Sequence, residues 1–144
     1  MYYLLKTSGF IALLFFLCGF TSADQDWQVY FENDLIRIEM NTYRCTSLQN
    51  GTDNNYILLR ISNKTHETIE VSYLKETWYD GVCSNCNSTS PEYANTLLLS
   101  PEQIKEGNCD SEQALRIFQN MPSGFTKRAL THFEIKNLAV KTLN

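Results

Sequence analysis

The chain has 144 residues, of which 12 are lysine or arginine and 16 are aspartate or glutamate, so its formal net charge is −4. The basic residues form no cluster, which argues against a partner recognised through its phosphates, whether nucleic acid or an anionic membrane surface. The length suits one domain around one hydrophobic core.

Residues 1–23 have the three parts of a secretory signal peptide. Lys6 supplies the positive charge, residues 10–20 are apolar, and residues 21–23 are the small Thr-Ser-Ala of a cleavage site. The apolar run is shorter than the ~20 residues that a membrane-spanning helix needs, so we expect the leader to be removed. Residues 24–144 are then one exported domain, periplasmic or secreted, with no transmembrane anchor in the mature form.

Short runs of alternating apolar and polar residues follow, and such alternation predicts strands with one buried face. In the first half the predicted strands are residues 27–31, 35–40, 56–61 and 69–73. Residues 50–55 are polar and predict a turn rather than a calcium loop. Residues 62–67 are also turn-prone, so we expect a hairpin connection between the strands on either side.

The second half continues the same pattern after a cysteine-rich loop. Its predicted strands are residues 96–99, 114–118 and 132–140. In the last of these, the apolar residues Phe133 and Ile135 are out of phase with Leu138 and Val140. We therefore expect a β-bulge near Asn137, which would return both pairs to one face.

The strands and the lack of helices together predict the fold class. Residues 101–106 offer a single helical turn at best, so the crossover helices of a parallel α/β fold are missing. About seven short antiparallel strands at this spacing predict an all-β fold. We expect an immunoglobulin-like Greek-key sandwich, stapled by disulfides, with a closed barrel as the alternative.

The cysteines support an oxidising location. Cys18 lies in the leader, and Leu17 before it is not the small residue that lipid attachment needs. The mature domain retains four cysteines, namely Cys45, Cys83, Cys86 and Cys109. An even number in an exported domain predicts two disulfides, each adding about 2–4 kcal/mol to stability. Sequence leaves three pairings open; we favour separate partners for Cys83 and Cys86, because a bond between them closes a very small loop.

Six pieces of the mature chain stand in a characteristic order. They are residues 32–39 (ENDLIRIE), 56–65 (YILLRISNKT), 76–86 (ETWYDGVCSNC), 106–109 (EGNC), 115–118 (LRIF) and 133–137 (FEIKN). In this order the chain resembles a group of small exported immunoglobulin-like β-sandwich proteins of Gram-negative bacteria. The resemblance covers most of the mature chain and implies the sandwich fold. The group has no assigned activity, so the resemblance implies no site residues.

The motif Cys83-Ser84-Asn85-Cys86 permits two kinds of cysteine chemistry besides structural bridges. A redox pair should open a helix that lowers the pKa of the first thiol, but residues 87–91 are typical of a loop. Four thiolates could instead hold zinc in tetrahedral geometry, although a second Cys-x-x-Cys is missing. Our preferred hypothesis is that the four cysteines form disulfides and that the protein binds no metal or cofactor. The alternative is a metal-handling protein that binds zinc through four thiolates.

No motif for catalysis is present in the sequence. Nucleophile-elbow, metalloprotease and phosphate-loop patterns are missing, and we expect both His66 and His132 to be exposed. A small hydrolase that uses two carboxylates is a third possibility. Its candidate residues are Glu67, Glu70, Glu76 and Asp80. Because Glu70 alternates with apolar neighbours, a solvated strand face explains it, and we predict that the chain is not an enzyme.

Two adjacent aromatic residues mark a candidate recognition patch of Trp78, Tyr79 and Asp80. Large aromatic side chains are enriched where partners or sugars are held, and loops on a rigid scaffold often present them. The alternative is that Trp78 is a core residue covering a disulfide, with Tyr79 pointing to the opposite face. We expect a non-enzymatic exported binding or structural module whose loop 78–91 contacts an unidentified protein or glycan.

Three Asn-x-Ser/Thr sequons begin at Asn50, Asn63 and Asn87. They are glycosylation candidates only in a eukaryotic host. A chain this rich in asparagine, serine and threonine contains such triplets by chance, so they do not distinguish between the functions above.

Overall fold

The computed structural model describes residues 26–111, 113–122 and 128–143. The predicted leader and its cleavage site lie outside the described residues. Within them the chain forms nine strands and two 3-10 turns. The strands are β1 (Gln28–Glu32), β2 (Ile36–Ser47), β3 (Thr52–Asn63), β4 (Thr68–Tyr79), β5 (Val82–Cys83), β6 (Ala94–Leu99), β7 (Ile104–Glu106), β8 (Arg116–Asn120) and β9 (Leu130–Leu143). The 3-10 turns are η1 (Pro91–Tyr93) and η2 (Gln113–Leu115).

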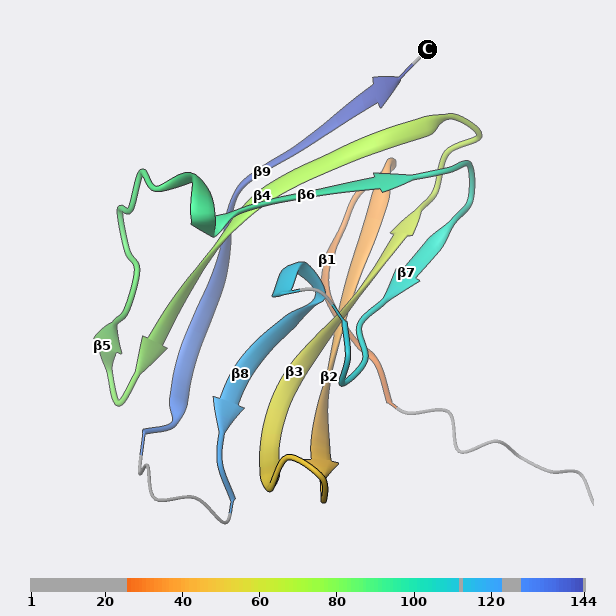
Figure 1. Ribbon diagram of the computed structural model, residues 1–144. Helices are drawn as coiled ribbons and strands as arrows, with labels where there is room; N and C mark the ends of the chain where they lie inside the picture. The colour runs from red at the N-terminus through yellow and green to blue at the C-terminus, as the bar shows by residue number, and fades with distance from the viewer. Residues whose placement is uncertain (1–25, 112, 123–127, 144) are drawn as a thin grey trace, which may run out of the picture.

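The strands form two antiparallel sheets, as Figure 1 shows. In the first sheet β1, β2 and β3 are successive neighbours, and β7 and β8 both pair with the other edge of β3. In the second sheet β9 pairs along nearly all of β4, so β5 and β6 share the opposite edge of β4. The predicted all-β, disulfide-stapled fold is confirmed, with nine strands in the described residues instead of about seven.

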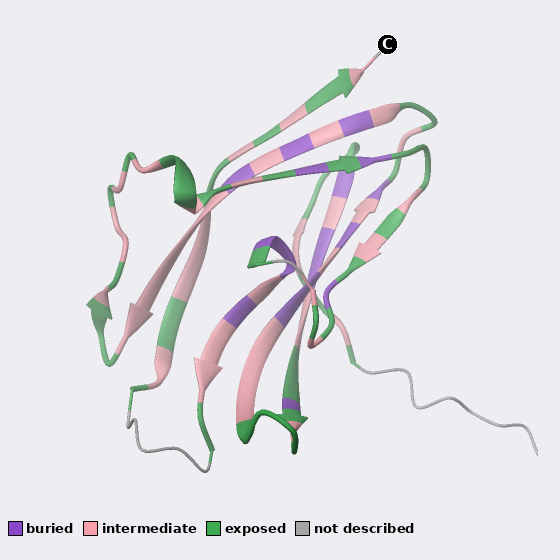
Figure 2. Ribbon diagram, viewed as in Figure 1, coloured by how far each residue is buried: buried purple, intermediate pink, exposed green. Residues whose placement is uncertain are grey.

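The core lies between the two sheets and follows the predicted alternation. Ile36 and Ile38 of β2 and Leu59 and Ile61 of β3 are fully buried. They pack in one cluster with inward residues of the second sheet, including Ile69, Val71 and Leu99. In Figure 2 the buried positions form alternating bands along β4. Removing these apolar side chains from water is the main force that holds the sheets face to face.

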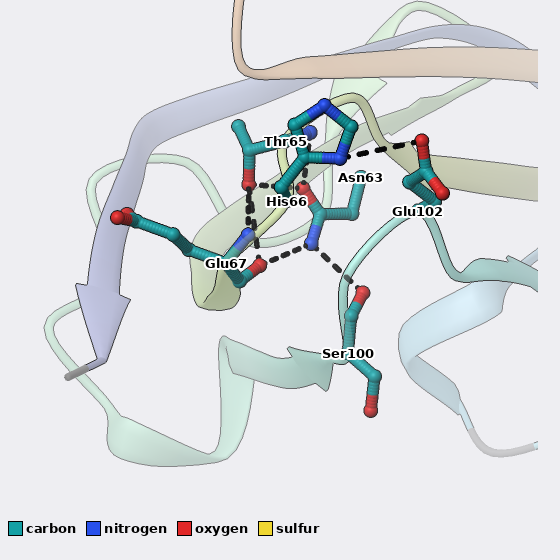
Figure 3. Close-up of polar contacts among 6 residues, drawn as sticks. All are labelled: Asn63, Thr65, His66, Glu67, Ser100 and Glu102. Carbon is teal, nitrogen blue, oxygen red and sulfur yellow. Dashed lines mark hydrogen bonds and ion pairs between the residues drawn. The ribbon is translucent and has the colours of Figure 1, made fainter.

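The connection between β3 and β4 is not the predicted hairpin, because these two strands belong to different sheets. Buried Asn63 organises this crossing (Figure 3). Its Nδ2 donates to the carbonyl oxygens of Glu67 and Ser100, both at 2.8 Å. Its Oδ1 accepts bonds from the backbone N–H and the hydroxyl of Thr65, at 2.9 and 2.8 Å. One amide therefore ties the β3–β4 connection to the end of β6.

Three further segments differ from the prediction. Residues 50–55 are a turn only at their start, because the β2–β3 ladder continues to the pair Ser47 and Thr52. Residues 114–118 begin in η2, and the strand starts only at Arg116. Residues 101–106 contain a turn followed by β7 instead of a helical turn. No helical segment in the described ranges has the length and apolar character needed to cross a membrane.

The predicted bulge in β9 is confirmed. Ser72 and Leu74 of β4 face Ala139 and Lys136, so β9 has one extra residue between these pairs. Asn137 lies in that interval with a φ of 51°, the left-handed region that asparagine tolerates better than most residues. The bulge is what allows the two halves of β9 to direct their apolar residues to the same core.

Candidate functional site

The four mature cysteines form two disulfides. Cys45 of β2 bonds to Cys109 in the segment after β7, with Cα atoms 5.5 Å apart. Cys83 of β5 bonds to Cys86, with Cα atoms 5.7 Å apart. The expectation of separate partners for Cys83 and Cys86 is wrong, because β5 lies on the second sheet whereas Cys45 lies on the first. Two disulfides are consistent with an oxidising location.

This pairing leaves no free thiolate among the four cysteines. Across the described ranges, no group of three or more histidine, cysteine, aspartate or glutamate residues is placed to hold a metal ion. A four-thiolate zinc site would therefore require both disulfides to open and cysteines from both sheets to meet.

Trp78, Tyr79 and Asp80 do not share one surface. The indole of Trp78 lies 4.9 Å from the ring of His132 on β9. Tyr79 points to the opposite face of β4, where its hydroxyl donates to the carbonyl oxygen of Phe118 at 2.8 Å. Asp80 has a φ of 51° in the two-residue turn between β4 and β5, and its carboxylate accepts the N–H of Ala129 at 3.1 Å. Trp78 is also outside the core cluster.

A cavity of about 380 Å³ lies on the side of β4 that carries Tyr79. Its walls come from β4, from β8 with the neighbouring Tyr56 and Gln113, and from the segment of residues 84–95. The lining residues are Tyr56, Lys75, Thr77, Tyr79, Ser84, Asn85, Glu92, Tyr93, Asn95, Gln113, Arg116, Ile117 and Phe118. Four aromatic rings and two cations thus surround a space large enough for a small molecule.

Lys75 continues the inward-facing positions of β4 and lies in the cavity wall. Its Nζ donates to the carbonyl oxygens of Gln113, Ala114 and Arg116, which joins β4 to η2 and β8. Burial and, to a smaller extent, the positive charge of Arg116 together lower the pKa of Lys75 to about 8. The amine is therefore satisfied by hydrogen bonds, but its charge is poorly solvated.

Arg116 supplies the second cation of the cavity. Its guanidinium carbon lies 5.2 Å from the centre of the Tyr56 ring, a distance typical of cation–π contact. Its Nη1 donates a hydrogen bond to the carbonyl oxygen of Cys109. Because Cys109 is bonded to Cys45, the longer disulfide also holds the backbone that positions Arg116.

The aromatic wall is built around Phe118. Its ring centre lies 5.9 Å from that of Tyr56 and 6.3 Å from that of Tyr79. Burial raises the pKa of the Tyr79 hydroxyl, which stays protonated to donate its hydrogen bond. Arg128 covers the Tyr79 ring, with its guanidinium carbon 5.5 Å from the ring centre.

The small disulfide ring shapes the third wall. Asn85, inside this ring, donates from Nδ2 to the carbonyl oxygen of Lys75 at 2.6 Å. It also accepts the N–H of Thr77 at 2.9 Å, while the N–H of Ser84 donates to the carbonyl oxygen of Thr77 at 2.8 Å. These bonds occupy the edge of β4 between the parts that β5 and β6 pair. The 84–95 segment is thereby fixed beside the cavity.

A second cavity, of about 430 Å³, adjoins the longer disulfide. It is lined mainly by the segment after β7, together with Tyr43 and Leu58. Its charged lining residues are the carboxylates Glu106 and Asp110, and it has one aromatic residue. The first cavity therefore offers more varied contacts to a small organic ligand.

Sequence reasoning missed Lys75 and Arg116. A signal for Lys75 was present, since it occupies the position after Ile69, Val71 and Tyr73 in the inward phase of the strand, where a charge is unusual. Arg116 gave no such signal, because it alternates with apolar residues as a solvated residue would. None of the acidic candidates Glu67, Glu70, Glu76 and Asp80 lines the first cavity.

Comparisons with known proteins do not assign the chain. No family model matches it, and neither the curated proteins nor the solved structures contain a match. The function must therefore be inferred from the geometry of the described residues.

Proposed function

We propose that this protein is a non-enzymatic exported binding module whose ligand site is the cavity between β4, β8 and the 84–95 segment. The observation that carries this proposal is the convergence of four aromatic side chains and two cations on a space of about 380 Å³. Small-molecule sites usually combine apolar walls with a few fixed polar groups in this way. The predicted recognition loop 78–91 contributes Tyr79, Ser84 and Asn85 to the walls.

The rigidity of the walls also supports a binding role. Each of the two disulfides holds one side of the cavity, and Lys75 joins β4 to η2 and β8 by three hydrogen bonds. A site ordered before binding loses less conformational entropy when the ligand enters, so it binds more tightly. Because the Lys75 amine is held by carbonyl groups, we assign it to positioning rather than to chemistry.

Export is part of the proposal and rests on two observations. Residues 1–23 have the composition of a cleavable leader. The two disulfides are consistent with export, because such bonds usually need a compartment in which thiols are oxidised. The periplasm or the extracellular medium meets this requirement, and the small-molecule ligand would be encountered there.

The proposal is tested by ligand screening with the oxidised, processed chain labelled with nitrogen-15. Mixtures of neutral, cationic and anionic small molecules are added, and backbone N–H shifts are followed by NMR. We expect a binding molecule to shift resonances of residues 75–79, 84–95 and 116–118. Binding that leaves these resonances unchanged and shifts another surface would refute the assignment of the site.

Two variants of the same loop serve as a matched pair. Ser84 lines the cavity, and Thr89 is exposed in the same segment without lining it. We expect Ser84→Trp to weaken ligand binding at least tenfold by filling the cavity mouth, while Thr89→Trp leaves affinity unchanged. Equal affinities of the two variants would place the ligand elsewhere.

A further inference from the structure

The first cavity has an excess of positive charge, although the whole chain is acidic. Lys75 and Arg116 both line it, and Glu92 is the one acidic residue among its described lining residues. The ion pairs between described residues involve neither Lys75 nor Arg116. Arg128 adds a further positive charge beside the Tyr79 ring.

Two neighbouring cations without a carboxylate partner are unfavourable in a partly buried site. The three hydrogen bonds of Lys75 go to neutral carbonyl oxygens, so they satisfy its donors without neutralising its charge. Arg116 donates to one carbonyl oxygen, and a guanidinium group has five N–H donors in a planar fork. The arrangement therefore retains both positive charge and donors of the geometry that a carboxylate accepts.

We propose that the ligand of this cavity is a small organic anion with a flat apolar body, such as an aromatic carboxylate; this inference rests on the proposed function. Arg116 binds the anionic group, and the positive charge of Lys75 stabilises it across the cavity wall. The rings of Phe118, Tyr79 and Tyr93 contact the apolar body. An anion placed here also removes the repulsion between the two cations, which gives binding an additional favourable contribution.

Benzoate is the probe, and benzamide is its neutral counterpart of nearly the same shape. Affinities are measured by NMR titration of the labelled, oxidised chain, with acetate and inorganic phosphate as further arms. We expect benzoate to shift the resonances of residues 75–79 and 116–118 and to bind at least tenfold more tightly than benzamide. Acetate and phosphate should bind at least tenfold more weakly than benzoate, because they lack the apolar body.

A pair of charge-removing variants identifies the group that contacts the anion. Arg116→Gln should lower the affinity for benzoate to that for benzamide. Lys141→Gln removes the same charge from an exposed position on β9, outside the cavity, and should leave the preference for benzoate intact. A preference that survives Arg116→Gln unchanged would refute the role of Arg116.

The pH dependence of the affinity for benzoate is a second readout, and a variant that merely fails to fold would not show the same change. Between pH 7 and pH 9 the amine of Lys75, with a pKa of about 8, loses its proton, so benzoate should bind more weakly at pH 9. In Lys75→Met this dependence should disappear, while Arg116 and Glu92, the other charged groups facing the cavity, remain.

The outcomes separate the two proposals. Benzamide that binds in the cavity as tightly as benzoate overturns the anionic ligand but leaves the binding site in place. If phosphate binds as tightly as benzoate, the proposal that the ligand needs a flat apolar body is wrong. If no molecule of any charge class shifts the cavity resonances, the proposed function itself fails.

Discussion

Asn63 shows how one buried polar side chain determines the course of the chain. It is 3% exposed, yet all of its amide atoms have partners, and these partners lie in the β3–β4 connection and at the end of β6. Because Nδ2 donates to carbonyl oxygens, this nitrogen is not available for glycan attachment in the folded chain. The sequons at Asn50 and Asn87 begin at exposed residues instead.

We expect Asn63→Ala to lower the free energy of unfolding by about 2 kcal/mol, because it removes the hydrogen bonds that this buried amide donates to the carbonyl oxygens of Glu67 and Ser100. Denaturant unfolding of the oxidised chain measures this loss. Asn50→Ala, at an exposed position in the β2–β3 turn, serves as the control and should change the value by about 0.5 kcal/mol or less. Equal effects of the two changes would contradict the bridging role.

Lys75 predicts an unusual dependence of stability on pH. Its pKa falls from 10.5 in the unfolded chain to about 8 in the folded one, mainly through burial. The folded state therefore binds fewer protons between these values, and stability rises as pH increases through this window. From pH 7 to pH 9.5 we expect a gain of about 2 kcal/mol from this group.

The gain is measured as the difference between the wild type and Lys75→Met in urea unfolding at the two pH values. Staying below pH 10 avoids the opposite contribution of Tyr73 and Tyr79, whose pKa values are raised by burial. A difference between the proteins that does not change with pH would show that the amine is well solvated.

Both residues mark the limit of sequence-based prediction at this scale. Alternation predicted correctly which residues of β3 and β4 face inward, but it predicts apolar side chains at those positions. Asn63 and Lys75 are polar because each bonds to carbonyl groups of segments more than 30 residues away, Ser100 for Asn63 and Ala114 for Lys75. Only the three-dimensional fold brings those carbonyl groups near.

At the scale of elements, the two disulfides constrain the chain very differently. Cys45 and Cys109 are 64 residues apart in sequence, whereas Cys83 and Cys86 are 3 apart. In the loop-entropy description the longer bridge contributes about 4 kcal/mol and the shorter about 2 kcal/mol. The shorter bridge acts mainly on its surroundings, because it holds Asn85 against the edge of β4.

We therefore expect different consequences when each pair is replaced by alanine. Loss of Cys45 and Cys109 should lower global stability by about 4 kcal/mol. Loss of Cys83 and Cys86 should lower global stability less. It should nevertheless accelerate hydrogen exchange of the Thr77 N–H, which donates a hydrogen bond to Oδ1 of Asn85. Unchanged exchange at Thr77 in the second variant would show that Asn85 holds its place without the bridge.

The bulge in β9 gives a second prediction for an element. Asn137 has a φ of 51°, where a β-branched side chain is strained. We expect Asn137→Val to lower the free energy of unfolding by about 1–2 kcal/mol, and Asn137→Gly to leave it nearly unchanged. Thermal unfolding of both variants measures this. Equal stability of the two would mean that the register of β9 does not depend on this conformation.

The phase of apolar residues along a strand predicted the fold more reliably than the composition of the turns. The phase change in β9 predicted the bulge correctly, because the core can accept apolar residues from one face only. The composition of residues 62–67 predicted a turn but could not tell a hairpin from a crossing between sheets, since both need the same polar residues. That choice depends on where β9 and β6 pair with β4, which are contacts remote in sequence.

At the scale of the whole molecule, the hydrophobic core and the proposed ligand cavity lie in different places. The inward faces of both sheets meet around Ile38, Leu59 and Val71, whereas the cavity lies where β4 continues to Tyr79 and β8 faces it. The fold class followed from strand spacing and cysteine number alone. The cavity could not be predicted, because its walls come from segments that the chain brings together only by crossing between the sheets.

The oxidised state of the four cysteines is the property on which this arrangement depends, and mass measurement tests both this state and the proposed export. We expect the mature chain to begin at Asp24 and to be lighter by four hydrogens than the fully reduced chain, with no bound metal. A zinc-thiolate protein would instead retain four thiols and carry zinc under native conditions. Reduction would not release the metal of a zinc-thiolate protein, because its thiols are already reduced. In this protein reduction should instead loosen the segment that contains Asn85 and the Cys109 backbone whose carbonyl oxygen holds the Arg116 side chain. Loss of benzoate binding on reduction, restored by reoxidation, would show that the shape of the cavity depends on the two disulfides. Binding that persists in the fully reduced chain would show that the cavity walls form without them.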